Sequence, residues 1–219
     1  MASPKNNANT SAAIRVNGKA IRGDMALALL ALKFLRKKDT LVYDLRISKA
    51  FAAFLRNKGI KPLPSPPQKK ELFQLMKENK ARLGAIMEGR IYSNKTAAPR
   101  PLSKRELERA AKQIAREEAK EAEKAFEKWH KSKPSLFKAR GSTEILISLL
   151  KKKYRRGAVM IYRKGILVEF SNWWFNLTER GNGKKKELEL IIEARQKKML
   201  EQKIKELKKL ISSHLKRPS

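Results

Sequence analysis

Runs of lysine and arginine are the residues of this chain that could do chemistry, and the chemistry they offer is contact with phosphate. The densest runs are Arg36–Lys38, Lys151–Arg156 and Lys184–Lys186, the last in a glycine-containing loop that follows Arg180. Each phosphate that such a cation neutralises releases condensed counterions, which favours binding to a nucleic-acid backbone. The sequence holds 53 lysines and arginines against 21 acidic residues, a formal net charge of +32 that opposes compaction unless a polyanion neutralises it.

The excess charge is spread along the chain, since segments 1–100, 101–140 and 141–219 carry net charges of +15, +5 and +12. We therefore expect contacts with RNA phosphates and 2′-hydroxyls from many points of the surface. Tyr154 and the Trp173-Trp174 pair lie near basic runs and could stack on bases, although aromatic residues at the ends of elements are usually core. The predicted RNA-binding residues are Lys5, Arg36, Lys37, Lys38, Arg46, Lys69, Lys70, Arg90, Lys151, Lys152, Lys153, Arg155, Arg156, Arg180, Lys184, Lys185 and Lys186.

Several classes of site are excluded by composition. The chain has no cysteine, which removes disulfides and thiolate metal sites, and two histidines cannot build a redundant histidine metal site. No apolar run approaches the length of a bilayer span, and no signal-peptide core follows Met1. We therefore expect no cofactor, no metal, no membrane association and a cytoplasmic location. Helices rich in lysine, glutamate and arginine are typical of thermophile proteins, and we expect the source to be a thermophilic archaeon or a similar microbe.

The elements that must position these cations form two folded parts. Residues 1–12 are expected to be an extended basic tail, and residues 13–100 an α/β domain, because strands and helices alternate at short spacing. Within that domain the pattern predicts a tight turn at Asn17-Gly18, and a rigid extended loop at Leu63–Pro67. The predicted strands are Ala13–Val16, Thr40–Leu45 and Leu83–Met87, and the predicted helices follow Asp24 and span Ser48–Asn57 and Lys69–Asn79.

The second half of the chain is predicted to be a charged helical linker over residues 101–140 and an α+β domain over residues 141–219. Ser103 and Glu106 form a capping-box pattern, which predicts one helix of about 28 residues running to about Lys131. The predicted elements of the α+β domain are a helix over Thr143–Tyr154, strands at Ala158–Tyr162, Ile166–Phe170, Trp173–Leu177 and Glu187–Glu193, and a basic helix from Ala194 to about Leu215.

Two stretches of the chain resemble the phosphohexomutase family, which comprises phosphomannomutases and phosphoglucomutases. The first is Arg15–Asp24, followed by an apolar helix and Leu41–Lys49, and it is similar to the family's third domain. The second covers residues 143–213, where Trp173–Leu177 and Glu193-Ala194 follow the motif order of the fourth domain. The resemblance implies an α/β layer followed by a small antiparallel sheet with helices, and no counterpart of the domain that carries the nucleophilic serine.

The resemblance also implies that the reactive positions of the family are changed. The three aspartates that hold magnesium in the family fall on Lys5, Asn7 and Asn9, which removes the hard anionic oxygens that this cation prefers. The sugar-binding carboxylate and serine fall on Ile86 and Glu88. The family's histidines fall on Lys69 and Arg90, while Arg46 and Arg180 preserve the charge of the family's cleft and phosphate loop. We therefore expect a catalytically degenerate pseudoenzyme with a cationic cleft.

Together these features predict a non-catalytic RNA-binding protein of mixed α/β and α+β fold. Charge spread over two small domains suits an irregular ribosomal RNA surface, so a ribosomal protein with neighbouring ribosomal proteins as partners and no small-molecule substrate is expected. Two alternatives stay open. A chromatin-type DNA-binding protein shares the charge argument, and a residual phosphosugar-binding enzyme or sensor would use Arg46 and Arg180.

Overall fold

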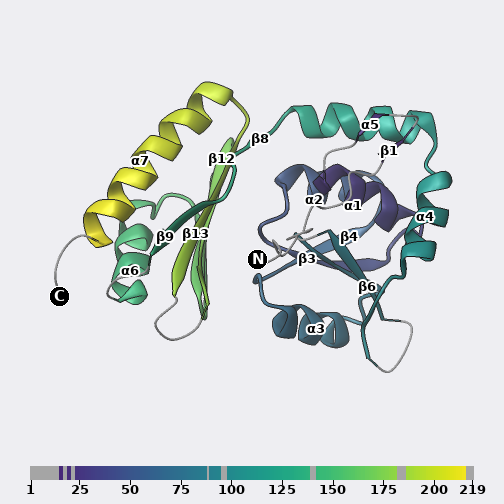
Figure 1. The fold of residues 1–219 in the computed structure, drawn as a ribbon, viewed down its shortest axis with the longest axis horizontal. Helices are drawn as coiled ribbons and strands as arrows, with labels where there is room; N and C mark the ends of the chain where they lie inside the picture. The colour runs from purple at the N-terminus through teal and green to yellow at the C-terminus, as the bar shows by residue number, and fades with distance from the viewer. Residues whose placement is uncertain are drawn as a thin grey trace, which may run out of the picture. The chain divides into compact units, whose positions relative to one another are not determined.

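The computed structural model describes residues 15–16, 19–20, 23–87, 89–94, 98–138, 142–181 and 186–215 (Figure 1). The chain divides into two compact units. The first runs to Ile47 and resumes over Phe51–Phe126, and the second comprises Ser48–Ala50 and Glu127–Ser219. Near the start of the chain, β1 (Arg15–Val16) pairs antiparallel with β2 (Lys19–Ala20). The expected basic tail and the turn at Asn17-Gly18 lie outside the described residues.

The first unit is built on a sheet in the order β4-β3-β5-β6-β7. β3 pairs in parallel with β4 and β5, whereas β5 with β6 and β6 with β7 are antiparallel. The mixed α/β architecture predicted from the alternation of elements is thereby confirmed. The strands are β3 (Thr40–Asp44), β4 (Lys61–Ser65), β5 (Leu83–Ile86), β6 (Arg90–Ser93) and β7 (Arg100–Pro101).

Helices cover both faces of this sheet, with α1 (Gly23–Leu32) and α2 (Lys49–Asn57) on one side and α3 (Lys69–Glu78) on the other (Figure 1). The seven consecutive residues 25–31 of α1 are buried, so this helix is apolar all round, as a core helix must be. Gly59 follows α2 with a φ of +78°, the left-handed conformation that commonly ends a helix.

The proline-rich segment after α2 differs from the prediction. Leu63–Pro67 was expected to be an extended loop, but residues up to Ser65 form β4, the outermost strand of the sheet. Pro62 and Pro64 lie opposite Leu41 and Tyr43 of β3. Proline is tolerated here because an edge strand has backbone N–H groups that need no partner within the sheet.

The prediction of a single long helix from Ser103 to about Lys131 is wrong. The capping box is confirmed, since Ser103 and Glu106 exchange both hydrogen bonds. However, α4 spans only Lys104–Lys112, and a separate helix, α5, spans Arg116–Glu127. Between them Ile114 is buried, and the carboxylate of Glu118 accepts hydrogen bonds from the backbone of Ala115 and from Lys33. Burial of Ile114 and a second capped helix start therefore replace the continuous helix.

The second unit is an antiparallel sheet in the order β10-β11-β12-β13-β8, and β9 also pairs with β13. The helices α6 (Thr143–Lys153) and α7 (Lys197–Leu215) begin and end close to the predicted residues. The four longer strands are β10 (Ala158–Tyr162), β11 (Gly165–Glu169), β12 (Trp173–Arg180) and β13 (Glu187–Ala194). Two short strands, β8 (His130–Lys131) and β9 (Ser135–Lys138), fall where helix and linker were expected.

The two faces of this sheet differ in chemistry. Alternate residues of β12 and β13, such as Phe175 and Ile192, pack with Leu150 of α6 and Leu207 of α7 into one apolar core. The residues between them on each strand point to the opposite face. That opposite face carries the buried polar side chains of this unit's strands, Asn176, Thr178, Glu189 and Glu193.

Candidate nucleic-acid interface

The first exposed cationic cluster lies in the turn between α1 and β3. Arg36, Lys37 and Lys38 are all exposed, and Lys38 adopts a φ of +73° that helps the chain to reverse. Asp39 closes the turn by accepting a hydrogen bond from the backbone N–H of Arg36 at 2.8 Å, so this carboxylate is engaged with the backbone. Within the described residues the three cationic side chains have no carboxylate partner, and they can therefore meet an external anion.

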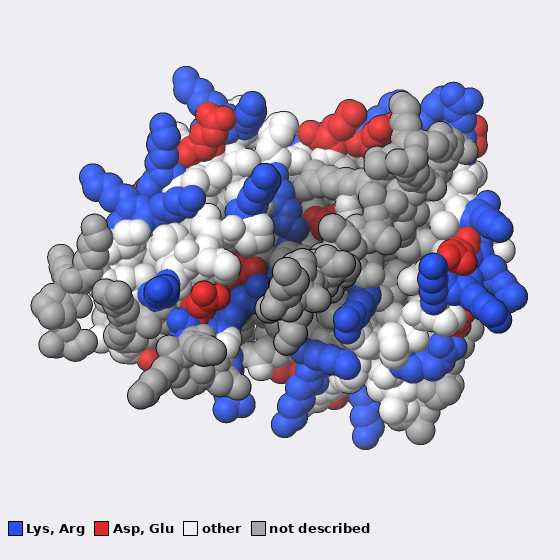
Figure 2. Space-filling model, viewed as in Figure 1, with Lys and Arg blue, Asp and Glu red and all other residues white. Residues whose placement is uncertain are grey.

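The second exposed cluster follows the end of α6. Lys151, Lys152, Arg155 and Arg156 are exposed and form no ion pair within the part of the chain that the structure describes. Lys153 differs, because its Nζ lies 3.2 Å from Oε1 of Glu206. Lysine and arginine side chains project at many points of the face shown in Figure 2, with fewer acidic side chains between them.

Glu206 of α7 joins the two helices of the second unit. It accepts hydrogen bonds from the Tyr154 hydroxyl and from Lys203, both at 2.8 Å, in addition to pairing with Lys153. Burial by itself would raise the pKa of Glu206, but the hydrogen bonds from Lys203, Tyr154 and Lys153 outweigh it and lower the pKa to about 2. Burial, with the bond to Glu206, raises the pKa of the Tyr154 phenol.

The lowered pKa of Glu206 predicts a pH-dependent contribution to stability. The contribution is fully present above the unfolded pKa of about 4.3 and is lost as the pH falls towards about 2. We expect Glu206→Gln to cost about 1 kcal/mol at neutral pH, because the site is partly exposed, and to converge with the wild type in acid. Urea unfolding between neutral pH and about pH 3 measures this. Glu201→Gln on the same helix is the control, and an equal loss in that variant would contradict the prediction.

Three further predicted residues lie in the first unit. Lys70 and Arg90 are exposed. Lys69, at the start of α3, holds its ammonium 5.2 Å from the ring centroid of Phe73 and 5.3 Å from that of Tyr92. These cation–π contacts orient Lys69 without neutralising it, so its charge stays available to an anion.

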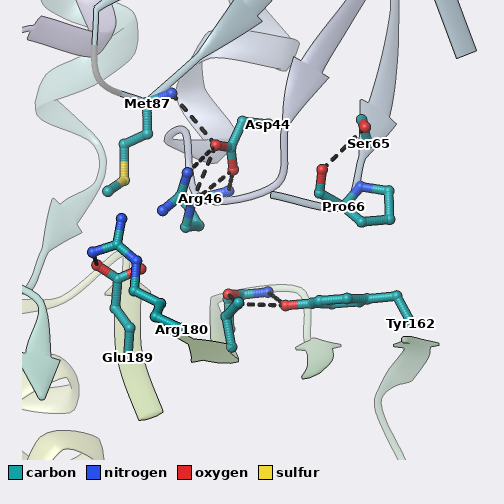
Figure 3. Close-up of polar contacts among 10 residues, drawn as sticks. Asp44, Arg46, Ser65, Pro66, Met87, Tyr162, Arg180 and Glu189 are labelled. Atoms are coloured by element: carbon teal, nitrogen blue, oxygen red, sulfur yellow. Dashed lines mark hydrogen bonds and ion pairs between the residues drawn. The ribbon is translucent and has the colours of Figure 1, made fainter. Parts of the chain in front are cut away.

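Arg46 is placed differently from the other candidates. It is buried, and Asp44 takes up its guanidinium, with Nε 3.0 Å from Oδ1 and Nη2 2.5 Å from Oδ2 (Figure 3). The same carboxylate accepts the backbone N–H of Arg46 at 2.9 Å. The guanidinium is therefore engaged by a carboxylate two residues away, at the end of β3.

The phosphate-loop candidates are only partly described. Arg180 at the end of β12 is exposed and donates to the buried carboxylate of Glu189 at 3.0 Å (Figure 3). Lys186 lies 3.3 Å from the carboxylate of Glu179. Lys184 and Lys185, and Lys5 in the tail, lie outside the described residues. Both described cations of this loop thus have a carboxylate neighbour, unlike the clusters at Arg36–Lys38 and after α6.

Tyr162, Asn176 and Thr178 form a hydrogen-bonded network on the polar face of the second sheet, the face opposite the apolar core. The Tyr162 hydroxyl is 2.6 Å from Oγ1 of Thr178 and accepts a hydrogen bond from Nδ2 of Asn176, also at 2.6 Å. Thr178 in turn donates to the Asn176 carbonyl. Gly165 makes room for this network, because a Cβ there would lie 2.2 Å from the Leu177 carbonyl oxygen and 2.6 Å from the Tyr162 hydroxyl.

We expect Gly165→Ala to destabilise the second unit by about 3 kcal/mol, since the added methyl meets backbone that cannot move without breaking the sheet. Chemical unfolding followed by circular dichroism measures this. Gly23→Ala is a matched control, because a Cβ at that position has nothing within 4 Å and should be nearly neutral. Equal stabilities of the two variants would contradict the packing argument.

Two buried carboxylates of this unit, Glu189 and Glu193, were not among the predicted site residues. Glu193 accepts a hydrogen bond from Nε1 of Trp174 at 2.7 Å. It also accepts one from the backbone N–H of Lys49 at 2.8 Å, and Lys49 belongs to the Ser48–Ala50 segment of the same unit. The signal that could have found them is the alternation of glutamate with apolar residues along β13, which places both on one face of the strand.

Base stacking by the aromatic candidates is not supported by their burial. Tyr154, Trp173 and Trp174 are 6%, 6% and 2% exposed. Trp173 stacks on Phe170 with centroids 4.8 Å apart, inside the core of the second unit. Their ring faces are occupied by protein, so base recognition through them is excluded in this conformation.

The described ranges also bear on metal and membrane sites. No group of three or more histidine, aspartate or glutamate side chains there could hold a metal ion. Lys5, Asn7 and Asn9, which fall on the family's magnesium positions, lie outside those ranges. No helix among the described residues is long and apolar enough to cross a bilayer.

Comparison with known proteins supports the resemblance to the phosphomannomutase/phosphoglucomutase family in sequence and in fold. No family model matches the chain. Over 199 residues it is 26% identical to a phosphomannomutase of Methanocaldococcus jannaschii, and the match covers 90% of this chain and 43% of that relative. The chain thus spans less than half the length of the curated relative that it matches.

Solved structures agree on the fold. A phosphoglucomutase/phosphomannomutase family protein of Burkholderia thailandensis matches with a TM-score of 0.64 and 15% identity, over 92% of this chain and 44% of that one. The open form of parafusin, a phosphoglucomutase from Paramecium, matches with a TM-score of 0.60 and 12% identity, over 86% of this chain and 40% of that one.

These comparisons correct one expectation. From the sequence, the chain was predicted not to be an enzyme, because the family's reactive positions carry other residues. The relatives that it matches are named as enzymes, phosphomannomutases and phosphoglucomutases, so the prediction is contradicted by this kinship, although the match covers only part of each relative.

Proposed function

We propose that this chain binds structured RNA through exposed cations carried by a scaffold that corresponds to the third and fourth domains of the phosphohexomutases. The observation that carries the proposal is the presence in each unit of a cationic cluster without a carboxylate partner among the described residues, Arg36–Lys38 in one and Lys151, Lys152, Arg155 and Arg156 in the other. A globular surface of net charge +32 with such clusters is suited to phosphate backbone.

RNA is favoured over duplex DNA because the clusters are borne on separate units and on turns. A helix-turn-helix protein places one recognition helix in the regular major groove of DNA, whereas RNA with loops and bulges offers phosphates in irregular positions. Ribosomal RNA is the most abundant RNA of this kind, and we extend the proposal to association with the ribosome. The burial of the aromatic candidates implies recognition by shape and phosphate position.

Arg46 takes a lesser part in this proposal than the exposed clusters. A phosphate contact by its guanidinium would have to displace the Asp44 carboxylate, whose hydrogen bonds to Arg46 are charge-assisted. Arg180 is in the same position with Glu189. We therefore assign the main contacts to the exposed clusters at Arg36–Lys38 and after α6.

The experiment compares the affinities of the purified full chain for a structured ribosomal RNA fragment and for duplex DNA of equal length at matched salt. We expect the RNA to bind at least tenfold more tightly. Sedimentation of native lysate through a sucrose gradient, with detection of the chain in ribosomal and free fractions, tests the ribosomal assignment. Equal affinity for duplex DNA would favour a chromatin-type protein instead.

A second candidate function follows from the relatives. The 26% identity to a phosphomannomutase favours a part in the handling of a hexose phosphate, with Arg180 on the polar face of the second sheet as the phosphate ligand. Interconversion of hexose 1- and 6-phosphates by the purified chain, abolished by Arg180→Ala, would support it. RNA affinity unaffected by added hexose phosphate would separate the two functions.

A further inference from the structure

The outermost strand of the second sheet, β10, is open at its outer edge. In the described residues β10 pairs with β11 alone, and its sequence is Ala-Val-Met-Ile-Tyr. Natural sheets usually block such an edge with proline, with lysine or with a covering element, because unpaired strand backbone recruits other chains. The corresponding edge of the first unit follows this rule, since β4 contains Pro62 and Pro64. β10 contains no such residue.

The register shows which backbone groups of β10 point outward. Glu179 donates its N–H to the carbonyl of Lys164, and Phe170 donates to Trp173, so the even-numbered residues of β11 bond to β12. The odd-numbered residues of β11 therefore bond to β10, and they lie opposite Ala158, Met160 and Tyr162. The N–H and C=O groups of Val159 and Ile161 are left facing away from the sheet.

The side chains of this strand are apolar and accessible. Met160 is 40% exposed and Ile161 is 49% exposed. Adjacent residues of a strand point to opposite faces, so β10 offers apolar surface on both sides of its open edge. An added strand could pack apolar side chains against either one while pairing its backbone with Val159 and Ile161.

The charges around β10 indicate what that added strand must be. Residues 151–164, which contain β10, carry seven lysines and arginines and no acidic residue. A second copy of this chain would bring an equally basic edge against it, and like charges facing each other across paired strands are destabilising. Nucleic acid would satisfy the cations but cannot complete a strand ladder or cover Met160 and Ile161. An acidic polypeptide can do all three things: neutralise the cations, complete the strand ladder and cover Met160 and Ile161.

We propose that β10 is a docking edge for an extended segment of a partner protein, with alternating apolar residues flanked by aspartates or glutamates. The segment adds a strand beside β10 through the backbone of Val159 and Ile161, and its acidic flanks meet the exposed cations Arg155, Arg156 and Arg163. The strand pairing uses backbone that no phosphate contact requires, whereas Arg155 and Arg156 are shared with the cationic cluster assigned to RNA.

The test uses the full chain and a labelled synthetic peptide of alternating valine and threonine with aspartates at both ends. We expect saturable binding in fluorescence anisotropy at about 50 mM salt, where charge complementarity is strongest. A peptide with lysines in place of the aspartates should bind at least tenfold more weakly. Absence of saturable binding by the acidic peptide would overturn the proposal.

Ile161→Pro is the decisive variant, because it removes an outward N–H and leaves the ladder to β11 intact. We expect it to weaken peptide binding about tenfold, whereas the control Ile161→Val, which keeps the N–H, should bind as the wild type does. Circular dichroism verifies that both variants fold. Equal binding by the two variants would rule out strand addition.

Amide hydrogen exchange provides a second readout on the unmodified chain. In the free protein the amides of Val159 and Ile161 should exchange quickly and those of Met160 and Tyr162 slowly, and the acidic peptide should protect the first pair. Protection of the first pair in concentrated protein without peptide would show self-association instead and would refute the proposal. The same protection by structured RNA alone would refute it equally.

Discussion

The affinity of the full chain for structured RNA is expected to fall on the order of a thousandfold when the salt concentration rises from about 50 to about 200 mM. This follows if the exposed clusters of the two units together neutralise roughly six to ten phosphates, since each neutralised phosphate releases counterions and steepens the salt dependence. Filter binding or fluorescence anisotropy over this salt range measures the slope.

Replacing Arg36, Lys37 and Lys38 together by alanine should reduce this slope by about 0.7 to 0.9 for each phosphate that is no longer neutralised, with little change in which RNA is preferred. The matched control is the triple alanine variant of Lys58, Arg100 and Lys104. These cations belong to the same unit and remove the same net charge, but they pair with Glu121, Glu106 and Glu108. The control should keep nearly the wild-type slope.

The two triple variants separate local contact from bulk charge. If both lose affinity equally, the chain attracts RNA by net charge alone and the cluster at Arg36–Lys38 is not a contact site. A slope near zero in the wild type would contradict phosphate binding as a whole. The same comparison can be made in the second unit with Lys151, Lys152, Arg155 and Arg156.

Asp44→Ala is expected to destabilise the first unit by about 3 to 5 kcal/mol, the usual cost of breaking a buried ion pair by removing one partner. Both partners of the ion pair are buried, with side chains 5% exposed for Arg46 and 1% for Asp44. The guanidinium keeps its charge, so without Asp44 it loses two charge-assisted hydrogen bonds in the interior. Urea unfolding measures the loss of stability.

Arg46→Ala should cost less, about 1 to 3 kcal/mol, because the remaining Asp44 still accepts the backbone N–H of residue 46. The double variant Asp44→Leu with Arg46→Met should return to within about 1 kcal/mol of the wild type, since it removes both charges and keeps the volume. A destabilisation below about 1 kcal/mol in Asp44→Ala would show that the pair is hydrated in solution.

RNA affinity of the same variants tests the role assigned to Arg46. If Arg46→Ala folds and binds RNA as the wild type does, while the Arg36–Lys38 variant does not, the binding surface consists of the exposed clusters. A large decrease of RNA affinity in a folded Arg46→Ala variant would show that Asp44 releases the guanidinium on binding.

Features that depend on neighbours in the sequence were predictable without a structure. The capping box of Ser103 and Glu106 forms within one helical turn, and it was predicted and confirmed. The longer strands of the second unit were also predicted, because alternation of apolar and polar residues along β12 and β13 records which face each side chain occupies. The net charge, and the class of partner that it suggests, likewise follow from composition.

Features that depend on distant residues could not be predicted in the same way. The break between α4 and α5 involves Glu118, which is held by Lys33 from far along the chain. The strands β8 and β9 are too short to show a pattern, and they exist because β13 offers them an edge. Propensity over two to four residues is weaker than the pairing that a neighbouring strand supplies.

The order of the amino acids was enough to identify a strongly basic mixed α/β protein with the motif order of the phosphohexomutases. It was not enough to tell which cations can meet a ligand, because Arg46 and Lys38 each lie within two residues of an aspartate in the sequence. Only the fold shows that Asp44 engages the Arg46 guanidinium, whereas Asp39 accepts the backbone N–H of Arg36 and Lys38 stays exposed. The position of β10 at the outside of its sheet also became visible only in the fold, since strand order follows from how the chain returns and not from local pattern. Strand order is set by the partners that folding brings together, and the folded backbone decides which group a nearby aspartate engages, so the sequence pattern alone specifies neither.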